Sequence, residues 1–359
     1  MMNSSELLAD ALAELGRDPA ARAAIIEALL AWEAAHQSDG DPIRDRVTGP
    51  IVDLLHAAIP SIERQLQSGV MMALPYTSRI AREFAMARAP LDHVWEPQTT
   101  SLLLGLARTA RTIIVAGAYA GDHAILIADA LRAQAGACLH CFDLDPRQIT
   151  AITHNARANG LDNLCINAIG LWDSPGHVVL EGEDSLGTAH AADQAASNAM
   201  RVTTVQDYAT SHGIAQIDLM MLDVEGAELR ILRGAVDFLS QPDNLAPDIV
   251  FEIHRHFTDW SEGLARTDIV ALLLSHGYHV YALRDIQGNA RVSPPGIELV
   301  ALDHVYLEGP PHGFNMFATR RPDTLARLGL IVRQDVSPKL LRHRLHALHQ
   351  PGGDGGKVQ

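Results

Sequence analysis

The stretch that decides the fold is Thr112-Ile-Ile-Val-Ala-Gly-Ala-Tyr-Ala-Gly-Asp-His123. Its first five residues are apolar or β-branched, which predicts a buried strand, and the glycines after them predict a tight turn. A helical pattern follows over 122–134. Tyr119 occupies the position that a middle glycine holds in the dinucleotide fingerprint G-x-G-x-x-G. The loop therefore fits a nucleoside better than a pyrophosphate.

The same alternation of strand and helix continues along the chain. We expect further strands at 137–143, 163–168, 177–180, 217–222, 248–253, 278–283, 298–307 and 314–318, and helices at 146–159, 226–239 and 269–275. This order predicts an α/β fold with a doubly wound, mostly parallel, Rossmann-like sheet, whose ligands bind at the carboxyl ends of the strands. Residues 181–200 are rich in Ala, Ser, Gly and Asp and are expected to form a mobile excursion.

The chain divides into three regions by pattern. Residues 1–95 form an N-terminal region whose apolar spacing predicts helices over 5–36 and from about 51 toward 67. It would serve as a cap, a lid or a dimer surface. Residues 96–320 hold the α/β domain. Residues 321–359 are a C-terminal extension whose glycine-rich tail, from Pro351, is expected to be disordered.

Composition limits the classes of partner. The 359 residues carry a formal net charge of −15 without a Lys/Arg run, so neither nucleic acid nor a membrane surface is an expected partner. The chain has three cysteines and its first residues do not resemble a signal peptide, so we expect a cytoplasmic protein. Cys138 and Cys141 form a C-x-x-C within an expected strand, where they would point to opposite faces, so packing is favoured over metal binding.

Acidic and imidazole side chains gather at the expected strand ends. Asp143 ends the second strand, where a carboxylate can accept hydrogen bonds from both ribose hydroxyls. The fourth strand ends with Asp223 and Glu225, which share a face if the backbone stays extended. The fifth strand ends with Glu252, His254 and His256, which share a face if the backbone stays extended. These three could join Asp223 in a divalent metal site, or supply a general base.

In these residues the chain resembles the FkbM-type S-adenosylmethionine-dependent methyltransferases over about 95–257. The resemblance rests on Trp95-Glu-Pro-Gln-Thr-Thr100, Gly117-Ala-Tyr-Ala-Gly121, Cys141-Phe-Asp-Leu-Asp-Pro146, Asp223-Val-Glu-Gly-Ala-Glu-Leu229 and Val250-Phe-Glu-Ile-His254. It implies S-adenosylmethionine as the cofactor, with Asp223 beside the transferred methyl group. It also implies a set of cofactor-binding residues: Glu96, Thr100, Gly117, Ala118, Tyr119, Gly121, Asp143 and Leu144. The chain departs from the family at Val115, where an Asp is usual, and Glu96 or Asp122 is expected to compensate.

The expected function is O-methylation of a hydroxyl group on a sugar or a secondary metabolite. His254 is the first candidate for the base, because an imidazole titrates near neutral pH. Asp223 and Glu225 would orient the acceptor, and Mg²⁺ would bind at Asp223, Glu252 and His254 if the site uses a metal. Two alternatives stay open: a nicotinamide-dependent oxidoreductase and a non-catalytic scaffold of methyltransferase fold. A homo-oligomer formed through the N-terminal helices is a further expectation.

Overall fold

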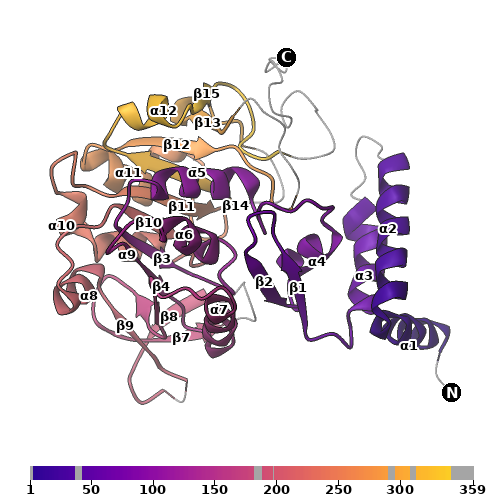
Figure 1. Ribbon diagram of the computed structural model, residues 1–359. Helices are drawn as coiled ribbons and strands as arrows, with labels where there is room; N and C mark the ends of the chain where they lie inside the picture. The colour runs from indigo at the N-terminus through magenta and orange to yellow at the C-terminus, as the bar shows by residue number, and fades with distance from the viewer. Residues whose placement is uncertain are drawn as a thin grey trace.

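A nine-stranded sheet organises the computed structural model, which describes residues 3–36, 43–181, 188–196, 198–289, 296–307 and 313–340 (Figure 1). The strand order is β15-β13-β12-β14-β11-β10-β3-β4-β5. Strand β3 pairs in parallel with β4 on one side and with β10 on the other, and β14 runs antiparallel to β11. The predicted doubly wound, mostly parallel sheet is confirmed. The strands are β3 (Thr112–Ala116), β4 (Cys138–Phe142), β5 (Leu164–Asn167), β10 (Leu219–Leu222), β11 (Asp248–His254), β12 (His279–Leu283), β13 (Glu298–Ala301), β14 (Gly313–Thr319) and β15 (Ile331–Arg333).

Helices cover both faces of this sheet, which explains the unbroken apolar run of β3. Ile113 and Val115 belong to a buried cluster that includes residues of α5 and α6, whereas Ile114 and Ala116 belong to a second cluster with residues of α8 to α11. A strand buried on both faces needs apolar residues at every position. The helices are α5 (Pro97–Ala107), α6 (Ala124–Leu131), α7 (Pro146–Ala158), α8 (Val205–His212), α9 (Glu228–Arg233), α10 (Val236–Leu239), α11 (Asp268–Ser275) and α12 (Asp323–Arg327).

A second, four-stranded sheet has the order β6-β9-β7-β8. Its strands are β6 (Gly170–Leu171), β7 (Gly176–Glu181), β8 (Thr188–Ala192) and β9 (Met200–Thr203). Within the excursion expected over 181–200, residues 188–192 form a regular strand, because β8 pairs with β7 in antiparallel register. The described residues 193–196 and 198–199 are turns and irregular backbone. Residues 182–187 and 197 lie outside the described residues. Trp172, Val178 and Val202 form the small core under this sheet.

The N-terminal region mixes helices with a hairpin. It contains α1 (Ser4–Arg17), α2 (Pro19–Ala35), the π-helix η1 (Arg44–Thr48), α3 (Gly49–Leu55), β1 (Ser61–Gln65), β2 (Met71–Pro75) and α4 (Arg79–Met86). The helix predicted from about 51 toward 67 ends at Leu55, and β1 pairs with β2 instead. Pro60 cannot continue a helix, and beyond it Ile62 and Leu66 are buried at the even spacing of a strand.

The hairpin is held on α7 by two side-chain amides. Asn155 donates to the carbonyl of Ala73 and accepts from its N–H, at 2.8 and 2.9 Å, and Asn159 makes the same pair of bonds with Met71, at 2.7 and 2.8 Å. These bonds satisfy the free edge of β2. The N-terminal region is thereby fastened beside the α/β domain, with β1, β2 and α4 between that domain and α1 to α3 (Figure 1).

Three leucines of α1 are exposed, namely Leu7, Leu8 and Leu15, whereas Leu12 is half-buried. The homo-oligomer expected through the N-terminal helices stays a prediction. Within the described residues, no helix combines the length and the apolar character that crossing a membrane requires. The tail from Pro351, expected to be disordered, lies outside the described residues.

Gly117 is required where β3 meets the end of β10. Its φ is +75°, a region that favours glycine, and an added Cβ would lie 1.6 Å from the carbonyl oxygen of Asp223. Two separate constraints therefore select glycine: the backbone conformation and the close approach of the neighbouring strand end.

Gly117→Ala is expected to lower the free energy of unfolding by about 3 kcal/mol or more, because the methyl group meets rigid backbone as well as an unfavourable φ. Gly136→Ala is the matched control, since Gly136 has a φ of +76° but open space around its Cβ position. It should cost only about 1 kcal/mol. Urea denaturation of both variants measures the difference, and equal losses would contradict the role of the close approach.

Candidate active site

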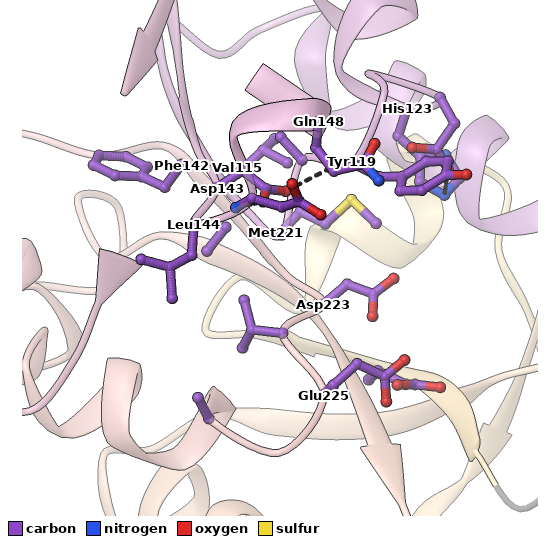
Figure 2. Close-up of a pocket in the computed structure, with 18 of the residues that line it drawn as sticks. Val115, Tyr119, His123, Phe142, Asp143, Leu144, Gln148, Met221, Asp223 and Glu225 are labelled. Atoms are coloured by element: carbon purple, nitrogen blue, oxygen red, sulfur yellow. Dashed lines mark hydrogen bonds and ion pairs between the residues drawn. The ribbon is translucent and has the colours of Figure 1, made fainter. Parts of the chain in front are cut away.

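A cavity of about 370 Å³ opens at the carboxyl ends of β3, β4, β10 and β11. Its volume falls in the range of small-molecule sites, and its position is the one expected for ligands of a parallel sheet. Figure 2 shows Phe142, Asp143 and Leu144 on one side of the cavity, and Asp223 and Glu225 apart from them on the other. The cavity therefore has an end beside β4 and an end beside β10 and β11.

The loop after β3 is fixed at its centre by Tyr119. This residue has a φ of +44°, its N–H donates to Asp143 at 3.0 Å, and its hydroxyl is hydrogen-bonded to that of Ser78 at 2.7 Å. Gly117, Ala118 and Tyr119 line the cavity. Gly121, also predicted to bind the cofactor, is not among the lining residues, and its Cβ position faces Ile125. The loop is short, and the side chain of Tyr119 points away from it toward the N-terminal region.

Asp143 presents a half-buried carboxylate at the end of β4. One of its oxygens accepts the N–H of Tyr119 and the other accepts the N–H of Asp145, at 2.9 Å. Burial raises the pKa of Asp143 to about 6, although these bonds favour its charged form. Each oxygen keeps a second lone pair, so the group can also accept from a vicinal diol. Leu144 lines the cavity beside it, as an apolar wall for a flat ring.

Three carboxylates meet at the opposite end. Asp223, Glu225 and Glu252 can each offer an oxygen within 4.8 Å of the others, and they are the one such group of potential metal ligands among the described residues. Burial and then the neighbouring carboxylates raise the pKa of Asp223 and of Glu252 well above the usual range. Burial and Glu228 raise that of Glu225 to about 7. Like charges this close favour a bound cation or a shared proton.

His254 lies on the same strand as Glu252 and lines the cavity, but it is not part of the three-carboxylate group. Its ring stacks on that of His256, with centroids 4.7 Å apart. The backbone N–H of His256 donates to Nδ1 of His254 at 3.1 Å. A neutral ring that accepts at Nδ1 carries its proton on Nε2. The predicted metal site combines Asp223 and Glu252 with His254. In the structure, Glu225 takes the place of His254 beside these two carboxylates.

Glu96 and Thr100 surround a buried histidine that the sequence analysis did not single out. Glu96 has a φ of +44°, lines the cavity and accepts from Asn315 at 2.6 Å. Thr100 is not among the lining residues and is hydrogen-bonded to Nδ1 of His123 at 3.0 Å. Burial alone would lower the pKa of His123, but Asp122 and Glu96 outweigh it and raise the pKa to about 9. His123 is therefore a cation among carboxylates.

Several lining residues lie outside the predicted set. They include Arg79, Ile80, His123, Gln148, Trp172 and Met221. His123 directly follows the glycine loop, so its place between strand and helix is the signal that could have found it. No comparable signal marks Arg79, because the fold of the N-terminal region cannot be read from its helical periodicity. Val115, at the family's usual acidic position, lines the cavity as a buried apolar residue.

Comparisons with known proteins give a family and a set of structural relatives. The model of the "Methyltransferase FkbM domain" matches residues 84–280, which is more than half of the chain. No curated protein sequence matches. Similar solved structures include an FkbM methyltransferase from Methylobacillus flagellatus KT, with 12% identity and a TM-score of 0.34, where the alignment covers 58% of this chain and 43% of that one.

Two further solved structures are similar over longer shares of their own chains. An O-methyltransferase from Bacillus cereus in complex with SAH has 14% identity and a TM-score of 0.33, over 62% of this chain and 79% of that one. A ribosomal protein L11 methylase from Lactobacillus delbrueckii subsp. bulgaricus has 13% identity and a TM-score of 0.29, over 64% and 84%.

Glu225→Gln is expected to stabilise the ligand-free protein. With a pKa of about 7 in the folded state and 4.5 in the unfolded chain, Glu225 makes the folded state bind more protons between these values. Stability therefore falls as the pH rises through this window, and the substitution removes that loss. After discounting for solvent screening, we expect a gain of about 1 kcal/mol and a rise in Tm of about 2 °C at pH 8, with little change near pH 4.5.

The matched control is Glu262→Gln, which removes an exposed glutamate and should leave Tm unchanged at both pH values. Thermal unfolding across pH 4.5 to 8 provides the measurement. If the Tm of Glu225→Gln equals that of the wild type at every pH, the proposal that ionised Glu225 destabilises the folded protein is contradicted.

Proposed function

Because the chain belongs to the FkbM methyltransferase domain family, we propose that it transfers the methyl group of S-adenosylmethionine to a hydroxyl group of a sugar or a secondary metabolite. The observation that carries this proposal is the charge distribution of the cavity. One end offers the Asp143 carboxylate for a diol, and the other gathers the carboxylates of Asp223, Glu225 and Glu252. A ligand with ribose hydroxyls and a positive charge complements both ends.

The same distribution disfavours a nicotinamide cofactor. A pyrophosphate needs backbone N–H groups or basic side chains, and Arg79 is the one Arg or Lys that lines the cavity in the described part of the chain. Seven lining residues are acidic, namely Glu96, Asp122, Asp143, Asp145, Asp223, Glu225 and Glu252. Two phosphates would be repelled by this surface. S-adenosylmethionine carries a sulfonium and an ammonium group, which the carboxylates attract.

The cofactor supplies an electrophilic methyl group for in-line displacement. The protein has to hold the acceptor oxygen in line with that group, exclude water and accept the hydroxyl proton. The sequence pattern favours His254 as the base, but the contacts favour Glu225. In the neutral His254 ring, Nδ1 accepts a backbone N–H and Nε2 carries the proton, so neither nitrogen is ready to take another. Glu225 lines the cavity and has a pKa of about 7.

A second proposal for the same three carboxylates is that they bind Mg²⁺. Hard divalent ions bind carboxylate oxygens, and Asp223, Glu225 and Glu252 fit this chemistry by type and spacing. A bound ion would lower the pKa of Glu225 and compete with a proton for its lone pairs, so an ion at this site would weaken Glu225 as a general base. Calorimetric titration with MgCl₂ separates the two proposals: heat that disappears in Glu252→Gln favours the metal, and the absence of heat favours the base.

Cofactor binding is the first test of the proposed function. We expect S-adenosylhomocysteine, titrated into the protein in a calorimeter, to bind with a micromolar Kd. Asp143→Asn should weaken it by about tenfold or more, because an amide offers one acceptor oxygen where the carboxylate offers two and loses the charge assistance. Asp162→Asn, in an exposed loop, is the control and should bind as the wild type does. No binding by folded wild-type protein would favour the non-catalytic scaffold.

The choice of base is tested by turnover. Glu225→Gln should still bind the cofactor, with a modest loss of affinity because one attracting carboxylate is removed. At saturating cofactor it should reduce kcat by about 10² or more, whereas His254→Gln should keep most of the activity. The assay follows S-adenosylhomocysteine release with an acceptor found by screening hydroxylated small molecules. The reverse pattern, with His254→Gln inactive and Glu225→Gln active, would restore His254 as the base.

A further inference from the structure

The helix α4 begins at the edge of the cavity, and its first five residues lie before the part of the chain that matches the family. Arg79 and Ile80, in its first turn, line the cavity. Ser78, the N-cap residue, accepts the N–H of Ala81 and is also hydrogen-bonded to the Tyr119 hydroxyl at 2.7 Å. The family match starts at residue 84. This chain therefore adds its own first turn of helix to the wall beside the glycine loop.

The position of α4 is fixed from several directions. Nε of Arg82 donates to Asp53 of α3 at 2.9 Å, and Arg44 of η1 donates to Glu83 at 2.6 Å. Phe84 is fully buried in the main core. A helix held by two ion pairs and a buried aromatic ring keeps its first turn in place. Arg79 consequently projects from a rigid support, which is what a binding residue requires.

Arg79 is one of two cationic side chains among the described lining residues. The other, His123, already lies within 3.8 Å of both Glu96 and Asp122. Arg79 is the one Arg or Lys among the lining residues that the structure describes, beside seven acidic ones. Its ion pair with Asp45 is 3.8 Å long and both side chains are about half exposed, at 48% and 41%. Such a pair contributes little, so the guanidinium can exchange it for a better partner. A planar guanidinium matches a carboxylate through two parallel hydrogen bonds.

Resting on the proposed function, we propose that Arg79 binds the carboxylate of the methionine part of S-adenosylmethionine. The proposed cofactor has one zwitterionic end, with an ammonium and a carboxylate group. Glu96 and Asp122, which line the same cavity, are suited to the ammonium group. In the described residues, Arg79 is the fixed cation suited to the carboxylate, and the N-terminus of α4 adds partial positive charge beside it.

The Tyr119 hydroxyl explains how this subsite is placed. Asp143 accepts the N–H of Tyr119 at the ribose position, while the side chain of the same residue reaches Ser78, next to Arg79. One residue thus connects the two polar ends of the proposed cofactor site. Asn155 adds a second connection, because it binds both Ala73 of the hairpin and the carbonyl of Ala120 in the loop, each at 2.8 Å.

The test compares two ligands that differ by one carboxylate. S-adenosylmethionine and decarboxylated S-adenosylmethionine are titrated by calorimetry into the full-length wild type, Arg79→Ala, Arg79→Lys and Arg88→Ala. Arg88 is the matched control, since it is an exposed arginine two residues beyond α4 that does not line the cavity. Circular dichroism and Tm establish that each variant is folded.

The proposal expects Arg79→Ala to raise the Kd of S-adenosylmethionine about tenfold, with no change for the decarboxylated ligand. Arg79→Lys should recover part of the loss, and Arg88→Ala should show none. Equal losses for both ligands, or an unchanged Kd for S-adenosylmethionine, would overturn the proposal and leave the cofactor assignment intact. If the folded wild type binds neither ligand, the proposed function itself fails, and this inference with it.

Discussion

The parallel pairing of β3 with both β4 and β10 is the constraint on which the rest of the structure depends. The chain leaves β3 toward β4 and β5 and returns to the other side through β10 and β11, so a crevice forms where the order reverses. Gly117 lets the backbone of Asp223 pass directly over the end of β3. Because of that close approach, Asp143 at the end of β4 and Asp223 at the end of β10 lie at the same edge of the sheet, on opposite sides of one cavity. A wider loop at residue 117 would separate the two halves of the site.

The neighbouring carboxylates at this edge of the sheet destabilise the ligand-free protein. Asp223 and Glu252 lie beside each other, and both are half-buried. Burial raises the pKa of each, Glu96 and Glu225 raise both further, and Asp223 adds to the rise at Glu252. A core of apolar residues would be more stable at this place, since buried like charges are costly without a partner. A cationic ligand removes the repulsion and gains affinity from it. The conflict is consistent with a site selected for a sulfonium-bearing cofactor or a metal ion rather than for packing.

Much of the α/β domain could be predicted from the sequence, because strands buried on both faces leave unbroken apolar runs such as Thr112–Ala116. The polar ends of these runs identified Asp143, Asp223 and Glu252 as residues of one edge. The N-terminal region could not be predicted in the same way. Its helical spacing extends past Leu55, but Pro60 and the pairing of β1 with β2 override it. The role of Arg79 depends on the Ser78–Tyr119 contact, which joins segments 41 residues apart and leaves no local pattern.

The residues that match the family and the residues outside that match contribute different parts of the cavity. Residues 84–280 contain the loop, Asp143 and the three carboxylates, which are the parts suited to hold a cofactor and carry out the transfer. Residues before 84 contribute Arg79 and Ile80, and the second sheet contributes Leu180 and Ala189 to the same cavity. These two walls come from the segments that the sequence patterns describe least. Because surface segments vary more readily than a buried parallel sheet, they are the places where the shape of the acceptor pocket can change while the chemistry of the strand ends is kept.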